Sequence, residues 1–396
     1  MKKSFPFEFL VILTPLLLAQ TTKADITPHL AAIQAVEKEG KGNKAASAAW
    51  QKLSAASADD LVTILGAMDH AGPLASNWLR SAVDVISDRA TAGGSGLPVT
   101  DLGEFLLDTN HSPKARRLAF DLIQSADATT ADKLIPGMLM DPSPELRRDA
   151  VARLISDGNA LMEANAKDTA ALVYRQALNG ARDVSQIQEI AAQLEKLGRT
   201  VDLPKHFGFL MHWNVIGPFD NSGRAGFDQV FPPEESIDLS AEYNGKRDKV
   251  KWVEFVTADP FGMVDINKAF GMEKEATAYA TTEFLSTSAR PAELRLGSKN
   301  AWKIWLNGEL IFGRDEYHRG AAIDQYQLPV SLKEGKNTLL VKLCQNEQTE
   351  TWTVEWQFQL RICDSTGTAI LAADRPATPT EGTNLQQAPN RRKAQP

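Results

Sequence analysis

Aromatic and polar side chains between residues 305 and 319 form a dense set of candidate binding groups. Trp305 shares a strand face with Lys303 rather than with the apolar residues of that strand, so we predict an exposed ring that can stack on a pyranose. The alternative is that this face is also covered, either by the edge of the partner sheet or by the helical half of the chain. The other candidate ligand-binding residues, which offer hydrogen-bond donors and acceptors, are Asn307, Asp315, Tyr317, His318 and Arg319. A solvated charged loop is the alternative for residues 314–319.

Patterns that carry covalent or metal-assisted catalysis are missing from the sequence. The six histidines are scattered, and none belongs to a His-Glu-x-x-His zinc motif. The segment GGSGL at residues 93–97 misses the spacing of a nucleophile elbow and lies in a linker. No glycine-rich phosphate loop is present. We therefore predict that the protein is not an enzyme. The alternative is a hydrolase with an unrecognised acid pair, because no pair stands out among 50 acidic residues.

Alternating apolar and polar residues after residue 204 predict the strands that position these candidates. Residues 352–362 alternate strictly over eleven positions, which indicates one strand with a buried face. Residues 293–296 and 302–306 alternate in the same way, and Asn307-Gly308 supplies the positive dihedral angles of a tight hairpin turn. The sequence therefore predicts an antiparallel β-sandwich over residues 205–372.

Turn and core residues of this region resemble a known family. Their order is similar to that of the galactose-binding-like jelly roll, and the similarity covers residues 277–367. The resemblance implies a jelly-roll sandwich that binds a glycan, binds a protein, or only packs against a neighbour. The motifs are LGS at 296–298, WLNG at 305–308, residues 332–335, Asn337 and LLVK at 339–342.

Two further expectations come with this resemblance. The segment WNVIGPFDN at residues 213–221 resembles a phrase of exported planctomycete-type bacterial proteins that carry the sandwich. Some of these jelly rolls contain a structural calcium ion, for which Asp364 is the candidate ligand together with neighbouring carbonyls. No other cofactor is expected.

Repeated helix signals define the part of the chain before the strands, residues 27–200. Ser112-Pro113 returns thirty-one residues later as Ser143-Pro144, and serine followed by proline is typical of a helix start. Such a period predicts an α-helical repeat domain of stacked hairpins, a solenoid. The segment DPSPE at 141–145 resembles the HEAT-like repeat, and residues 170–198 resemble a tetratricopeptide hairpin. The resemblance implies a protein partner, and a purely structural bundle is the alternative.

The two ends of the chain predict its location. Residues 1–24 combine two early lysines, an apolar stretch and small residues, which predicts a signal peptide and an exported, periplasmic or extracellular protein. An uncleaved anchor is the alternative, but the stretch is short for a membrane span and no later segment is longer. The net charge of −7 argues against nucleic acid as a partner. Residues 373–396 predict a disordered tail.

The two cysteines, Cys344 and Cys363, are predicted to be free thiols. A hairpin turn at residues 346–350 would place Cys344 opposite residue 353, about 33 Å along the strand from Cys363. That separation far exceeds the reach of a disulfide.

These expectations combine into one leading hypothesis. The sequence predicts an exported, non-catalytic binding or scaffold protein, with protein contacts through its helical repeats and glycan or protein binding through its β-sandwich. A carbohydrate-active hydrolase and a structural envelope component without a small ligand are the two alternatives.

Overall fold

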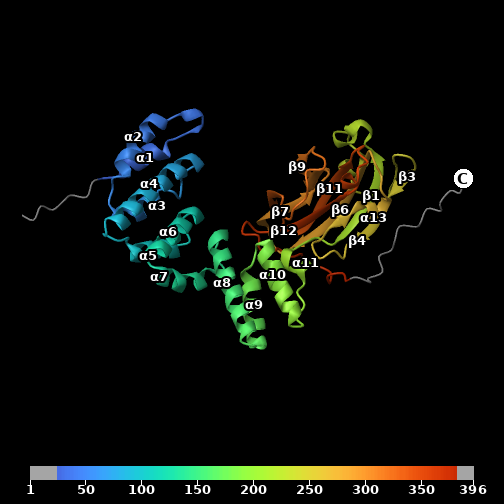
Figure 1. The fold of residues 1–396 in the computed structure, drawn as a ribbon. Helices are drawn as coiled ribbons and strands as arrows, with labels where there is room; N and C mark the ends of the chain where they lie inside the picture. Colours follow the sequence, from blue (N-terminus) through green and yellow to red (C-terminus); the bar gives the residue numbers. More distant parts are fainter. Residues whose placement is uncertain (1–24, 381–396) are drawn as a thin grey trace, which may run out of the picture. The chain divides into compact units, whose positions relative to one another are not determined.

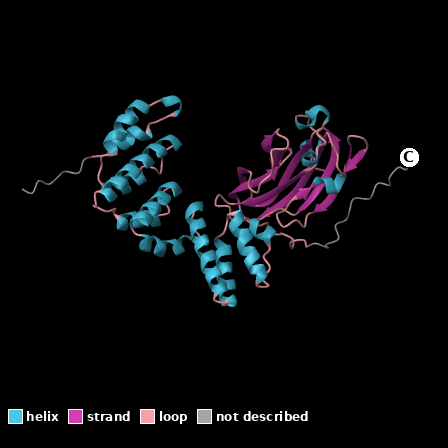
Figure 2. Cartoon of the chain, viewed as in Figure 1, coloured by secondary structure: helices cyan, strands magenta, loops and turns pink. Residues whose placement is uncertain are grey.

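The computed structural model describes residues 25–380 and places helices before strands along the chain (Figure 1, Figure 2). The predicted order of helices followed by antiparallel β-sheets is confirmed. The predicted signal peptide and residues 381–396 of the predicted tail lie outside the described residues. Within the described range, no helix is both long enough and apolar enough to cross a membrane.

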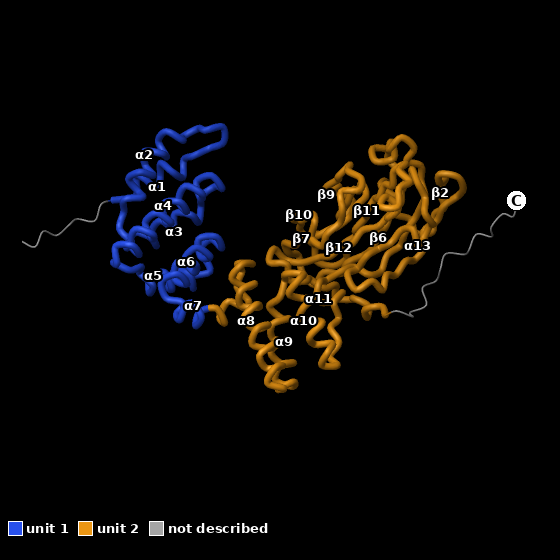
Figure 3. The backbone as a smooth tube through the Cα atoms, viewed as in Figure 1, with its two compact units in different colours: residues 1–134 blue, residues 135–396 orange. Residues whose placement is uncertain are grey.

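The chain divides into two compact units, the first ending at Leu134 and the second beginning at Ile135 (Figure 3). Helices make up the regular structure of the first unit. Its helices are α1 (Thr27–Gln34), α2 (Asn43–Leu53), α3 (Leu61–Gly66), α4 (Pro73–Ala92), α5 (Val99–Leu107), α6 (Pro113–Ala126) and α7 (Ala128–Leu134).

Both Ser-Pro phrases start helices, as predicted. The hydroxyl groups of Ser112 and Ser143 accept hydrogen bonds from the backbone N–H three residues later, at 3.2 and 3.5 Å. Each phrase also positions a buried arginine that donates from Nε to a nearby backbone carbonyl, at 2.7 Å for Arg116 and 2.8 Å for Arg147. The repeated sequence therefore builds the same local structure twice, once in each unit.

Four helices of the second unit share one apolar cluster with residues that lie beside its strands. They are α8 (Pro144–Glu163), α9 (Lys167–Gly180), α10 (Val184–Lys196) and α11 (Leu203–Phe207). Arg361 donates to the carbonyl of Phe207 at 3.0 Å, and Arg182 donates to the hydroxyl of Thr368 at 3.0 Å. Because these contacts and a shared apolar cluster tie α8–α11 to the sheets, the division between units falls inside the helical region predicted for residues 27–200.

The strands of the second unit form two main antiparallel sheets. One has the order β4-β1-β6-β11-β8-β9 and the other β10-β7-β12-β5. The strands are β1 (His212–Asp220), β2 (Glu242–Asn244), β3 (Lys249–Lys251), β4 (Val253–Val256), β5 (Val264–Asp265), β6 (Ala276–Ser286), β7 (Arg290–Ser298), β8 (Ala301–Leu306), β9 (Glu309–Arg314), β10 (Tyr326–Leu332), β11 (Gly335–Gln345) and β12 (Gln357–Cys363). The short helices here are η4 (Ser222–Phe227), α12 (Pro232–Glu235), α13 (Ile266–Phe270) and η5 (Thr351–Thr353).

Both sheets contribute side chains to one hydrophobic core. Trp213 of β1, Trp302 of β8 and Trp356 all belong to this core and are almost fully buried. Alternation along each strand sends the next residue to the opposite face. The outward face of the six-stranded sheet is covered in part by residues 221–252, here called the cap segment, whose Phe231 and Trp252 lie in a second apolar cluster. The structure therefore buries apolar side chains on both faces of this sheet.

The predicted strand at residues 352–362 is wrong in its first half. Trp352 lies in η5 and is 59% exposed, and β12 begins only at Gln357. Buried Gln345 donates to the carbonyl of Thr353 at 3.0 Å, and buried Asn300 donates to the carbonyl of Glu355 at 3.1 Å. These side chains take the place of a neighbouring strand, so the segment is irregular despite its alternating pattern.

The predicted hairpin at residues 346–350 is also wrong, because β11 and β12 belong to different sheets. The two free thiols are nevertheless confirmed, since Cys344 and Cys363 are buried and unpaired.

Burial raises the pKa of each thiol to about 11. We expect neither thiol to react with Ellman's reagent at pH 8 in the folded protein and both to react in urea, because the thiolate is the reactive form. Fast labelling of either thiol without denaturant would contradict this expectation.

Candidate functional site

Trp305 does not provide the exposed ring that the sequence predicted. Its side chain points to the outward face of the six-stranded sheet, as expected, but it is only 8% exposed. Phe231 and Trp252 of the cap segment and Tyr279 of β6 belong to the cluster that covers it. The predicted stacking platform is therefore a core residue beneath the cap segment. The face is covered, as the alternative expected, but by the cap segment rather than by the partner sheet's edge or the helical half.

Asn307 and Asp364 have structural hydrogen-bonding roles. Asn307 occupies the predicted hairpin turn with a φ of 53°, accepts from the backbone N–H of Thr338 at 3.0 Å and donates to Asn337 at 3.0 Å. The carboxylate of Asp364 accepts from the backbone N–H groups of Thr366 and Thr368, at 2.9 and 3.0 Å, and so closes a turn. Among the described residues, no group of three His, Cys, Asp or Glu side chains could bind a metal ion.

Tyr317 and His318 lie beside an exposed tryptophan that the sequence did not single out. The rings of His318 and Trp352 meet edge to face, with 5.5 Å between their centroids. His318 has a φ of 58°, and its Nε2 lies 2.9 Å from Oδ1 of Asn346, which follows β11. This contact between two loops holds the imidazole beside the Trp352 ring.

Arg224 of η4 joins these two loops to the start of the cap segment. Its guanidinium lies 5.3 Å from the ring centroid of Tyr317 and forms two hydrogen bonds to Glu347, at 3.1 and 2.5 Å. Those hydrogen bonds lower the pKa of Glu347 to about 2, so this carboxylate stays ionised at any physiological pH. Arg224, Tyr317, His318, Asn346, Glu347 and Trp352 are called the loop cluster below.

A buried amide supports the loop cluster from beneath. Asn221 is fully buried and donates to the carbonyl of Gln345 at 2.9 Å and to the Tyr317 hydroxyl at 3.3 Å. Its Oδ1 atom, like Nδ1 of His318, is buried without a hydrogen-bond partner among the described residues. Buried polar atoms are normally paired with protein or water. The loop cluster therefore has hydrogen-bonding capacity that its own side chains do not use.

Asp315 and Arg319 are exposed on the loop that contains Tyr317 and His318. The side chain of Arg319 is 72% exposed and lies 3.8 Å from Glu316. The structure thus brings Tyr317 and His318 into the cluster and leaves Asp315 and Arg319 at its border. A sequence signal for Trp352 did exist, since the residues on either side of it are all polar, but the alternation pattern hid it.

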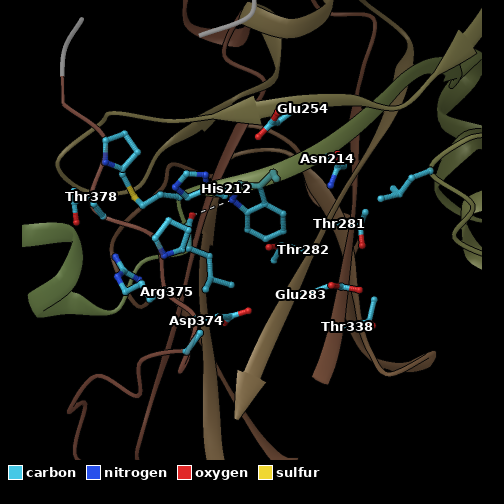
Figure 4. A pocket seen from close by; sticks show the side chains of 18 of the residues that line it. His212, Asn214, Glu254, Thr281, Thr282, Glu283, Thr338, Asp374, Arg375 and Thr378 are labelled. Carbon is cyan, nitrogen blue, oxygen red and sulfur yellow. Dashed lines mark hydrogen bonds between the residues drawn. The ribbon is translucent and has the colours of Figure 1, made fainter. Parts of the chain in front are cut away.

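A pocket with a volume of about 510 Å³ lies at the β4 side of the six-stranded sheet (Figure 4). Strands β1, β4, β6 and β11 contribute to its lining, together with residues 237 and 239 of the cap segment and residues 372 and 374–379 near the C-terminus. It is called the sheet-edge pocket below. Its charged, imidazole and amide side chains are His212, Asn214, Glu254, Glu283, Asp374 and Arg375.

The segment that walls this pocket belongs to the predicted disordered tail, but residues 373–380 are described. Arg375 donates to the carbonyl of Phe209 at 2.9 Å, and the Thr378 hydroxyl donates to the carboxylate of Asp202 at 2.9 Å. The backbone N–H of Ala373 donates to Leu285 at 2.9 Å. These contacts attach the start of the predicted tail to the sheet and to the segment before α11.

Comparisons with known proteins leave the family of this chain open. No protein-family model matches the sequence, and no curated protein resembles it significantly. Solved structures with a partial likeness include a β-glucosidase from Kluyveromyces marxianus in complex with glucose, at 15% identity and a TM-score of 0.19 over 23% of this chain and 11% of that one. Another is an FMN-binding β-glucuronidase from Facaelibacterium prausnitzii L2-6, at 14% identity and a TM-score of 0.23 over 38% and 21%. Each likeness spans only a small part of the enzyme concerned, and scores this low carry no argument for fold or function.

Proposed function

We propose that this chain is a non-catalytic binding protein whose two-sheet region binds a glycan at the loop cluster. The exposure of Trp352 is the observation that carries the proposal. Trp352 is 59% exposed, although tryptophan is normally well buried. A flat apolar ring at the surface can stack on the C–H face of a sugar, while polar groups beside it orient the sugar hydroxyls.

The neighbours of Trp352 supply those polar groups. Arg224 is a donor and Glu347 is an ionised acceptor, and both are about half exposed. Asn346 is buried and holds His318 in place. Arg224 and Glu347 are hydrogen-bonded to each other at the surface, and His318 is held by Asn346. An exposed ring bordered by a donor and an acceptor suits a hydroxyl-rich ligand.

The described part of the first unit, residues 25–134, offers no comparable feature. Its large exposed apolar side chains, Leu74, Val85 and Leu107, are dispersed over α4 and α5, as is usual on soluble surfaces. We therefore assign ligand binding to the second unit. A scaffold role of stacked HEAT-like hairpins toward a protein partner, the jelly-roll identity of the two sheets, and export to the periplasm or the exterior remain parts of the proposal.

We expect Trp352→Ala to weaken binding of the best ligand from a glycan-array screen by about tenfold or more, since a tenfold change corresponds to about 1.4 kcal/mol. Loss of the stacked ring removes both buried apolar area and the preferred ring geometry. Binding is measured by isothermal titration calorimetry on the chain without residues 1–24. Leu310→Ala is the matched control, because Leu310 is also apolar and 50% exposed, and it should bind like the wild type. Equal affinity in Trp352→Ala and wild type would overturn the assignment of the site.

A hydrolase is the second candidate function, and the sheet-edge pocket favours it. Three carboxylates, Glu254, Glu283 and Asp374, line that pocket. Acid pairs at a sugar-binding pocket are the usual machinery of glycoside hydrolysis. Incubating each glycan that binds and analysing the products separates the two functions, because a binding protein leaves the glycan intact.

A further inference from the structure

The floor of the sheet-edge pocket is a row of polar side chains in strand register. Asn214 of β1 is paired with Glu254 of β4 on one side and with Thr281 of β6 on the other. Glu283 of β6 and Thr338 of β11 form a second pair two residues farther along, because the partner of Thr281 on β11 is Leu340. Since neighbouring strands lie about 4.8 Å apart, the three polar groups of the first row follow one another at regular steps across β4, β1 and β6. Such a row can contact successive polar groups of an extended ligand.

Several of these groups have no partner among residues 25–380. Among the described residues, the side chains of Glu254, Asn214 and Asp374 form no hydrogen bond or ion pair, and Nε2 of His212 is buried without a partner. Figure 4 shows Glu254 and Asn214 on one side of the pocket and Asp374 on the opposite side. The pocket therefore exposes unused acceptors on two sides of one cavity.

The charge of the lining is negative. The lining contains three carboxylates and one guanidinium group, that of Arg375. This guanidinium already donates to the carbonyl of Phe209 at 2.9 Å. Burial lowers the pKa of His212, so its imidazole is neutral at pH 7 and does not offset the carboxylates. Glu283 has a partner in Lys336 at 2.8 Å, but both side chains are more than half exposed. Surface ion pairs of this kind are weak and readily exchanged.

We propose that the sheet-edge pocket binds a glycan whose sugars carry free amino groups. The proposal rests on the proposed function, glycan binding by the second unit, and adds a second site with its own ligand chemistry. Ammonium groups pair with Glu254 and Asp374, and ring hydroxyls bond to Asn214 and the threonines of the floor. A volume of about 510 Å³ is typical of pockets for small ligands and accommodates a few sugar rings.

The test compares three probes on the chain without residues 1–24. They are oligomers of glucosamine, oligomers of N-acetylglucosamine and oligomers of galacturonic acid, titrated calorimetrically at low and at high salt. We expect the glucosamine oligomer to bind about tenfold or more tightly than the N-acetylated one at low salt. High salt should narrow the difference because it screens the carboxylates, and the galacturonate should not bind. Equal binding of the first two probes, or preference for the galacturonate, would overturn the proposal.

Two sets of variants locate the effect. Glu254→Gln combined with Asp374→Asn keeps the shape of the pocket and removes two charges, so it should abolish the preference for the amino sugar. Glu309→Gln changes an exposed carboxylate on β9 and is the control. An undiminished preference in the double variant contradicts the inference, provided that circular dichroism shows a folded chain.

Failure of the inference and failure of the proposed function give different results. If Trp352→Ala leaves all neutral glycans bound as before but Glu254→Gln with Asp374→Asn removes the amino-sugar preference, the loop cluster is not the glycan site and the pocket proposal stands. If Trp352→Ala abolishes neutral binding and no amino preference exists, the proposed function stands and the pocket proposal is wrong.

Discussion

Lys342→Met is expected to lower the free energy of unfolding of the second unit by roughly 3–5 kcal/mol, the usual cost of removing one partner of a buried ion pair. Lys342 lies on the outward face of β11, and its side chain is fully buried. Its ammonium group donates to the carbonyls of Phe227 and Gln229, at 3.1 and 2.7 Å, and to Glu234 at 2.8 Å. One side chain thus connects the sheet to three positions of the cap segment.

Methionine fills a similar volume, so the expected loss is one of charge and hydrogen bonding. Without Lys342, Glu234 remains as a largely buried carboxylate whose other contact is the hydroxyl of Tyr279. The two backbone carbonyls lose their donor, and unpaired buried polar groups are unfavourable. We therefore expect the cap segment to loosen first, before the sheets unfold.

The measurement is urea unfolding followed by circular dichroism and tryptophan fluorescence. Lys336→Met is the matched control, since Lys336 lies on the same strand and pairs with Glu283 at 2.8 Å in an exposed position. An exposed pair contributes about 1 kcal/mol at most, so this variant should be close to the wild type. Similar losses in the two variants would show that the buried contacts of Lys342 add nothing.

Local patterns predicted those elements whose structure depends on a few neighbouring residues. Ser112 and Ser143 begin helices because a hydroxyl cap and a following proline act within one helical turn. Asn307-Gly308 forms its hairpin because only a few residue types tolerate positive dihedral angles. The outward direction of Trp305 follows from strand periodicity in the same way.

Burial by distant segments was not predictable. Trp305 is covered by the cap segment, which lies more than fifty residues earlier in the sequence and is largely irregular. Trp352 is exposed because Gln345 and Asn300 satisfy the backbone that a strand would otherwise pair. In both cases the alternation pattern is the same as that of a regular strand, and long-range contacts decide whether the tryptophan is buried or exposed.

The sheet-edge pocket combines a predictable floor with an unpredictable wall. The outward direction of Asn214 and Thr281 follows from the alternation of β1 and β6. The sequence predicted a disordered tail that includes residues 373–380, because they carry little apolar surface. A few polar contacts, such as that of Arg375 with Phe209, attach them to the sheet, and composition does not reveal contacts of that kind.

The second large effect concerns the contact between the helices and sheets of the second unit. Asp324 accepts two hydrogen bonds from Arg361, at 2.6 and 2.5 Å, and one from Arg295 at 2.8 Å. Arg361 is 2% exposed and also donates to the carbonyl of Phe207 in α11 at 3.0 Å. Asp324→Asn leaves two buried guanidinium groups without this counter-charge. We expect a loss of roughly 3 kcal/mol in urea unfolding at pH 7, as for other broken buried pairs.

The loss should depend on pH in a defined direction. Burial by itself raises the pKa of Asp324, but the hydrogen bonds and charges of Arg361 and Arg295 outweigh it, so the pKa lies below its ordinary value. A carboxyl group whose pKa is lower in the folded state stabilises the fold above its unfolded pKa of about 3.9, and this contribution disappears as the pH falls through the folded value. The difference in the free energy of unfolding between wild type and Asp324→Asn should therefore be constant near neutrality and shrink below about pH 4.

Asp157→Asn, at an exposed pair with Arg153 in α8, is the control, and its free energy of unfolding should be almost that of the wild type at any pH. A gap between wild type and Asp324→Asn that stays constant down to pH 2 would mean that the effect comes from packing and that the charge of Asp324 does not tie α11 to the sheet.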